Sequence, residues 1–105
     1  MNWIYLILAG IFEVGWPLGM KLSQTMSSKI VGIIIAVISM ALSVLFLWIA
    51  QKTIPIGTAY AVWTGIGAVG TLLVGIIYFG DSANIWRLLS ATLIVIGIVG
   101  LKLSY

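Results

Sequence analysis

Four long apolar segments set the limits on what this chain can fold into. They cover about residues 3–21, 30–50, 57–79 and 85–103, and short polar stretches separate them. A helix that crosses the hydrocarbon core of a bilayer needs about 20 predominantly apolar residues. Lipid offers no hydrogen-bond partners, so a spanning segment of this length must satisfy its own backbone as a helix. We therefore predict an all-α membrane protein with four transmembrane helices, in which residues 1–105 form a single transmembrane domain.

Composition excludes most other classes of protein. The chain is 63% hydrophobic and 7% charged, whereas soluble domains carry about 25% charged residues. Cys and His are both absent, which removes thiol and imidazole catalysis and the commonest zinc sites. The basic residues are scattered rather than grouped into a nucleic-acid-binding patch. We expect a protein that is not an enzyme, with no cofactor, metal or nucleic acid, and with a lipid bilayer as its surroundings.

The first apolar segment lacks the features of a secretory signal. No basic residue precedes it, and no small-residue cleavage site follows it. We expect this segment to remain in the mature protein.

Loop charges give almost no bias in membrane orientation. One side of the predicted bundle carries Lys52, Lys102 and the amino terminus, and the other carries Lys21, Lys29 and Arg87. Orientation normally follows an excess of Lys and Arg on the cytoplasmic side. A balance this close predicts insertion both ways round, and hence an antiparallel homodimer whose inverted copies resemble the inverted repeats of larger transporters. The alternative is a weak bias with orientation set by partners.

Glu13 is the one acid inside an apolar segment. It lies about 15 Å along the first predicted helix, near the middle of a hydrocarbon layer about 30 Å thick. An acid there costs about 2.5 to 3.5 kcal/mol on insertion scales, so it indicates a functional site. Gly10 and Trp16 flank it on the same helical face, and Pro17 frees its backbone carbonyl. The alternatives are a protonated glutamate that joins two helices and a proline that only kinks the helix. Asp81 lies in a loop, and we expect no role for it.

Three aromatic residues lie deeper than the membrane interfaces. Tyr60 and Trp63 share one helical face, and Trp16 lies beside the buried carboxylate. Alone they would favour helix packing; with a carboxylate they favour an aromatic box for a cation. Ser39 and Ser43 share a face of the second segment and offer hydroxyls to the carboxylate or to the tyrosine. Bonding back to their own helix is the alternative for each serine.

Small residues recur at intervals of four, which lets helices approach closely and bend. Gly65 and Gly67 belong to two such series in the third segment, and we predict that they permit bending. Gly97 and Gly100 give the fourth segment a small-residue packing face. The series are Gly57, Ala61 and Gly65; Gly67, Thr71 and Gly75; and Gly15 and Gly19. Residues 65–70 also match a dinucleotide-binding pattern, but the match lies in an apolar segment and carries no meaning.

Three segments carry a resemblance that extends over the whole chain. Residues 9–16 read AGIFEVGW around the glutamate, residues 55–67 read PIGTAYAVWTGIG, and residues 97–102 read GIVGLK. Together they resemble the small multidrug resistance family, and its guanidinium-exporter branch in particular. The branch assignment depends on Trp16, because relatives that export bulky aromatic cations typically have Gly there.

The resemblance implies a fold and an activity. It implies four helices per chain in an antiparallel, dual-topology homodimer that spans the bacterial plasma membrane several times. The activity would be proton-coupled antiport, exporting guanidinium or small substituted guanidinium cations by alternating access. The implied partners are therefore a small organic cation, protons and a second copy of the chain.

The resemblance also implies roles for individual residues. Glu13 would bind substrate and proton in turn, and Trp16 and Ser43 would hold its carboxylate. With these two residues, Gly10, Tyr60 and Trp63 would line the pocket. The fourth helix, with its small-residue face, would form the dimer interface.

Two departures from the family's pattern concern substrate size. Gly15 stands where a bulkier residue is expected, and Pro17 stands where a small residue is expected. If they widen the pocket, the chain would be a broader exporter of hydrophobic quaternary ammonium cations. A third hypothesis is a non-transporting membrane subunit in which Glu13 joins helices.

Overall fold

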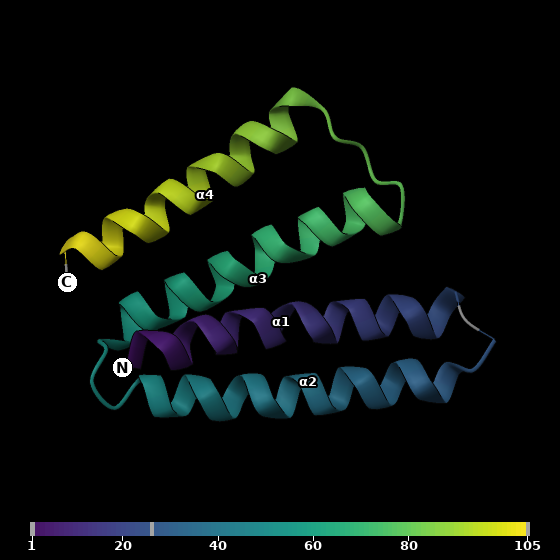
Figure 1. Ribbon diagram of the computed structural model, residues 1–105, viewed down its shortest axis with the longest axis horizontal. Coiled ribbons are helices and arrows are strands. Elements are labelled where there is room, and N and C mark those ends of the chain that lie inside the picture. Colours follow the sequence, from purple (N-terminus) through teal and green to yellow (C-terminus); the bar gives the residue numbers. More distant parts are fainter. Residues whose placement is uncertain (1, 26, 105) are drawn as a thin grey trace.

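The computed structural model describes residues 2–25 and 27–104, and it is helical nearly throughout (Figure 1). The helices are α1 (Asn2–Thr25), α2 (Lys29–Ala50), α3 (Ile56–Tyr78) and α4 (Ile85–Ser104). Each is long and apolar enough to cross a membrane. The prediction of an all-α protein with four helices of membrane-spanning length is therefore confirmed.

Helix α1 extends four residues beyond the expected end of its apolar segment. The polar residues after Lys21 include no Gly or Pro, so nothing in them stops a helix. Two of them bond back to the preceding turn: the Ser23 hydroxyl donates to the Met20 carbonyl at 2.6 Å, and the Thr25 hydroxyl donates to the Lys21 carbonyl at 3.2 Å. The helix also continues through Pro17.

The helices form a flat arrangement of 45 × 34 × 17 Å. Helix α1 lies between α2 and α3, and α4 packs mainly along α3, diverging toward the α3–α4 loop (Figure 1). Near its C-terminal end α4 also reaches α1, where the Lys102 ammonium lies 5.1 Å from the centre of the Trp3 ring. Glycines allow the closest approach, between α1 and α2. A Cβ atom on Gly19 would lie 2.6 Å from the Ala36 nitrogen and 2.7 Å from the Gly32 oxygen. The small-residue spacing therefore acts at this contact.

Substituting Gly19 should separate α1 from α2. Gly19→Ala places its methyl group against backbone atoms, which cannot rotate away, so we expect a loss of about 1–3 kcal/mol in stability. Gly57→Ala is the matched control, because nothing lies within 4 Å of a Cβ there. Thermal unfolding in detergent, followed by circular dichroism, compares the two. Equal melting temperatures would contradict the close packing.

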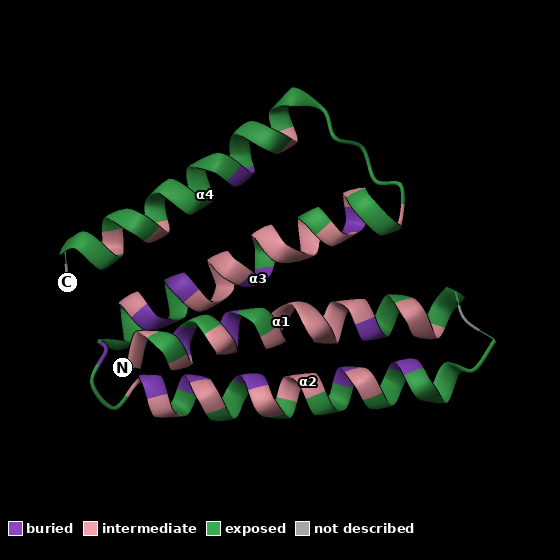
Figure 2. Ribbon diagram, viewed as in Figure 1, coloured by how far each residue is buried: buried purple, intermediate pink, exposed green. Residues whose placement is uncertain are grey.

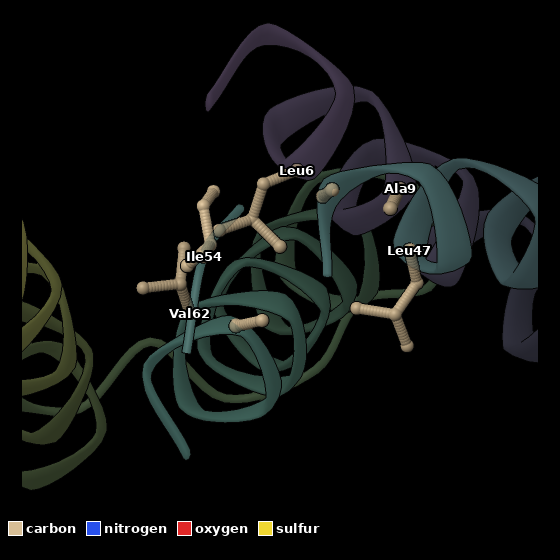
Figure 3. Packing of buried hydrophobic residues seen from close by; sticks show 7 residues of the cluster. Leu6, Ala9, Leu47, Ile54 and Val62 are labelled. Carbon is tan, nitrogen blue, oxygen red and sulfur yellow. The ribbon is translucent and has the colours of Figure 1, made fainter. Parts of the chain in front are cut away.

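The apolar core lies at one end of the bundle, where α1 begins, α2 ends and α3 begins (Figure 3). Ile54, in the α2–α3 loop, is only 2% exposed and packs there with side chains of all three helices. The core consists of Leu6, Ala9, Leu47, Ala50, Ile54, Ala59 and Val62. Many large apolar side chains outside this core are exposed. Exposed residues are most frequent on α4 (Figure 2), as expected for a chain surrounded by lipid.

The α3–α4 loop folds back against α3. Gly80 has φ +72°, a left-handed conformation that favours glycine. The turn lets the Asp81 amide donate to the Gly75 carbonyl at 3.0 Å. Helix α4 then starts with an Asn84 cap, whose side-chain oxygen accepts a bond of 3.0 Å from the Arg87 amide. This fold brings the loop's carboxylate back toward the bundle.

Candidate functional site

Glu13 lies near the middle of α1, about 16 Å from its first residue. Its side chain is partly buried. Trp16, one turn along the same face, donates its indole N–H to Glu13 Oε1 at 2.6 Å. A charge-assisted bond this short fixes one oxygen of the carboxylate. The predicted proximity of Trp16 to Glu13 is thus seen directly.

Ser43 connects the carboxylate to α2 and α3. This serine is fully buried, and its Oγ lies 3.4 Å from Glu13 Oε2. The Trp63 indole N–H donates to the same Oγ at 2.8 Å. Ser39, the other serine considered, lies instead against Gly15 at the α1–α2 contact. Glu13, Trp16, Ser43 and Trp63 therefore form one hydrogen-bonded group drawn from three helices.

The Ser43 hydroxyl has one proton and two acceptors within reach. It lies 2.7 Å from the Ala9 carbonyl and 3.4 Å from Glu13 Oε2. A hydroxyl donates a single hydrogen bond and accepts up to two. The shorter distance favours donation to the Ala9 carbonyl, and the Ser43 oxygen, which already accepts from Trp63, can accept one more hydrogen bond. Ser43 can therefore accept a bond from a protonated Glu13 or, by rotating, donate to an ionised one.

Removing the Ser43 hydroxyl should destabilise the protein measurably. In Ser43→Ala the Trp63 N–H loses its acceptor, and an unsatisfied buried donor costs about 1–3 kcal/mol. Adding Trp63→Phe removes that donor, so the double variant should recover part of the loss. A double-mutant cycle of thermal unfolding measures the coupling; strictly additive effects would contradict the bond.

The two glycines predicted to bend α3 have different neighbours. A Cβ on Gly67 would collide with the Glu13 Cγ atom and lie 3.1 Å from its Cβ. A Cβ on Gly65 would lie 2.9 Å from the Ile98 side chain on α4. Gly67 thus makes room for the carboxylate side chain, whereas Gly65 makes room for α4. Gly10 is also buried, with Ile66 2.6 Å from its added Cβ, and permits close contact between α1 and α3.

A cavity of about 450 Å³ opens onto Glu13. It runs between α1, α3 and the start of α4, and it contains both acids of the chain. Its lining comprises Glu13, Pro17, Thr64, Gly67, Ala68, Thr71, Leu72, Asp81 and Arg87. A second cavity of about 220 Å³ shares Pro17, Thr71 and Asp81 with it and adds Lys21. The two adjoining cavities therefore extend from the carboxylate toward the end of the bundle at the α3–α4 loop.

Other predicted site residues lie outside this group. Tyr60 is 57% exposed and contacts only the Trp63 ring among the aromatic pairs, at 5.5 Å between centroids. It does not line the cavity at Glu13. Gly97 and Gly100 are exposed on α4 and have no neighbour within 4 Å of an added Cβ. Thr71, Asp81 and Arg87 line the cavity although the sequence pattern did not identify them.

Comparison with known proteins relates this geometry to a family. The sequence model described as Small Multidrug Resistance protein matches residues 1–94. The chain belongs to the small multidrug resistance family. A member named guanidinium exporter, from Yersinia pseudotuberculosis serotype I (strain IP32953), is 52% identical over 99% of both chains. Members of the same name from Proteus vulgaris and Escherichia coli (strain K12) are 51% identical, over 99% of this chain and 99% and 98% of theirs.

Membership of the small multidrug resistance family confirms the resemblance seen in the sequence. Together with the four apolar helices, it makes the chain a multi-pass protein of the bacterial plasma membrane. The departures from the family's pattern now have locations: Gly15 faces Ser39 on α2, whereas Pro17 lines both cavities. Of the two, only Pro17 is placed to affect the space beside Glu13.

Proposed function

We propose that this chain exports guanidinium or a small substituted guanidinium cation. The observation that carries the proposal is a membrane-embedded carboxylate, bonded by Trp16 and open to a cavity. Relatives about half identical over nearly the whole chain bear the name guanidinium exporter. In this proposal residues 1–105 act as one transmembrane domain and a transporter, with no enzymatic step.

The carboxylate has capacity left for a planar cation. An ionised carboxylate accepts about four hydrogen bonds. Trp16 occupies one acceptor position on Oε1, and Ser43 lies near Oε2. The remaining positions suit the parallel N–H donors of a guanidinium group, which binds carboxylates in a two-point fork. Tyr60 and Trp63, whose rings contact each other, do not line the cavity at Glu13 within one chain. We propose that they contribute cation–π contacts to the substrate pocket when two copies assemble.

A single carboxylate also supplies the coupling to protons. A proton on Glu13 removes the charge that holds the cation, so substrate and proton bind in turn. If the protein changes the side to which Glu13 is open only when one of them is bound, inward proton flow drives outward cation flow. The Ser43 hydroxyl suits both states, because it can accept from the protonated acid or donate to the ionised one.

We further propose that two copies assemble antiparallel through α4. Lys52 follows α2 and Lys102 lies near the end of α4, whereas Lys21 lies toward the end of α1 and Lys29 and Arg87 lie at the starts of α2 and α4. Figure 1 shows these two sets of helix ends at opposite ends of the bundle, which keeps the orientation bias small. The exposed glycines of α4 offer a surface for close helix packing. Two inverted copies would bring two Glu13 carboxylates to one site.

Dual topology predicts that a C-terminal tag reaches both faces of the membrane. In inverted vesicles and in spheroplasts, a membrane-impermeant reagent should label roughly half of a single-cysteine tag from each side. Lys52→Gln should shift the proportion of the two orientations, because the Lys and Arg residues at the two ends of the bundle are nearly equal in number and one charge changes the bias. Labelling from one side only would contradict the antiparallel dimer.

Transport currents from the reconstituted protein on a supported membrane test the function. We expect currents with guanidinium and little with tetrapropylammonium, a bulky quaternary cation. Currents with both would favour the broader exporter and implicate Pro17 in the wider pocket. Absence of current with either cation would favour the non-transporting subunit.

A further inference from the structure

The cavity at Glu13 has a second acid at its far end. Gly67 lies against Glu13 and Gly75 lies against the Asp81 carboxylate. Eight helical residues separate the two glycines, so the carboxylates are offset by about 12 Å along α3. Thr71 lies midway on the same helical face. The series Gly67, Thr71 and Gly75, which the sequence pattern assigned to helix packing, therefore lines a passage between Glu13 and Asp81.

In the part of the chain that the structure describes, some polar side chains along this passage have no partner, in contrast to Glu13 and Thr64, which are bonded. Asp81 forms no ion pair within residues 2–25 and 27–104, although Arg87 and Lys21 line the cavities that it shares. The Nε of Arg87 is buried and has no hydrogen-bond partner among the described residues. Because a buried donor is nearly always bonded, this N–H indicates water or another acceptor in the cavity, and it does not itself bind a cation, which offers donors only.

Thr71, midway along the passage, also has a side-chain polar group that forms no hydrogen bond within the described ranges. On these helices Thr64 and Thr92 turn their hydroxyls back to carbonyls of the preceding turn, each at 2.8 Å. The Thr71 hydroxyl makes no such bond within the described ranges, and the residue lines both cavities. Its oxygen is therefore free to accept a bond from a passing N–H donor.

We propose that Asp81 is a second, weaker cation-binding station, from which the cation reaches Glu13 past Thr71. This inference rests on the proposed guanidinium transport. Asp81 is exposed at the end of the bundle, so its charge attracts cations where they enter or leave the cavity. Arg87 lines the same cavity with the opposite charge and opposes that attraction. The balance between the two sets the local concentration of cation near the mouth.

Opposite charges in one cavity give the proposal a sharp test. The full chain is reconstituted as wild type, Asp81→Asn, Arg87→Gln and the double variant. Initial guanidinium uptake is measured well below half-saturation and at saturation. Asp81→Asn should lower the uptake rate at low guanidinium about tenfold, because electrostatic steering changes association rates by about tenfold or more. The rate at saturating guanidinium should change little. Arg87→Gln should raise the uptake rate at low guanidinium, and the double variant should lie near wild type.

Two controls separate attraction by charge from damage to the loop. Asp81→Glu should restore most of the rate, because it keeps the charge. Both effects should shrink in about 1 M potassium chloride, where the screening length falls to about 3 Å. An Asp81→Asn variant equal to wild type would overturn the station, as would equal losses in both single variants at low and saturating guanidinium. Absence of guanidinium uptake by wild type would instead overturn the proposed function and the station with it.

Discussion

Glu13→Gln is expected to abolish proton-driven guanidinium uptake. The amide keeps the size of the side chain and an oxygen for the Trp16 indole, which now donates to Oε1 at 2.6 Å. It carries no charge for the cation and cannot exchange a proton. Truncating one partner of a buried charge pair costs about 2–5 kcal/mol, or about 30- to 5,000-fold in affinity. Uptake into vesicles with an imposed proton gradient measures the effect.

A matched variant shows whether charge or geometry is responsible. Glu13→Asp keeps the charge but withdraws the carboxylate by one methylene from Trp16, so we expect weak, still coupled uptake. Equilibrium titration with guanidinium, followed by tryptophan fluorescence, should detect binding to Glu13→Asp and none to Glu13→Gln. Proton-driven uptake by Glu13→Gln at the wild-type rate would refute the exchange of substrate and proton on this residue.

Gly67→Ala should have the second largest effect, a loss of about tenfold or more in uptake. Its methyl group would occupy the space of the Glu13 Cγ atom. The Cγ atom is bonded directly to Cβ, so rotating the carboxylate group alone cannot relieve the clash. Either the Trp16 bond breaks or α1 and α3 separate, and overpacking of this kind costs about 1–3 kcal/mol. Uptake and tryptophan fluorescence in the same vesicles report both changes.

Gly65→Ala is the control that distinguishes space for Glu13 from helix bending. Its methyl group would lie 2.9 Å from Ile98 Cδ1, the end of a side chain that can rotate, and 3.2 Å from Ile94 Cγ2, which needs to move by only a few tenths of an ångström. We therefore expect a small effect on uptake. If instead both glycines serve to bend α3, the two alanine variants should lose activity equally, and the role that we assign to Gly67 would be wrong.

The sequence allowed much of the site to be predicted because helical periodicity acts over short distances. Glu13 and Trp16 are three residues apart on one helix, so their contact followed from the pattern. Ser39 and Ser43 share a face of α2, and only the relative height of α1 and α2 decides which one reaches the carboxylate. That height depends on the close approach at Gly19 and Gly32, which is a tertiary property.

Helical periodicity could not predict which neighbours the glycines of α3 contact or where Asp81 lies. Gly65 and Gly67 are two residues apart and so face different helices, one toward α4 and the other toward Glu13. Asp81 follows a predicted helix end, where acids are ordinarily solvated. The left-handed turn at Gly80 brings it back over α3. A local pattern contains no information about where such a loop comes to lie.

The loose attachment of α4 has a consequence for how such proteins diversify. This helix packs mainly on α3, and its outer glycines, Gly97 and Gly100, face open space. If two copies pair through α4 as proposed, mutations on that outer surface change which copy a chain pairs with while leaving the chemistry of the carboxylate intact. Gene duplication could then yield two chains that recognise each other rather than themselves. The same separation offers a design route to mixed pairs that carry a single working glutamate.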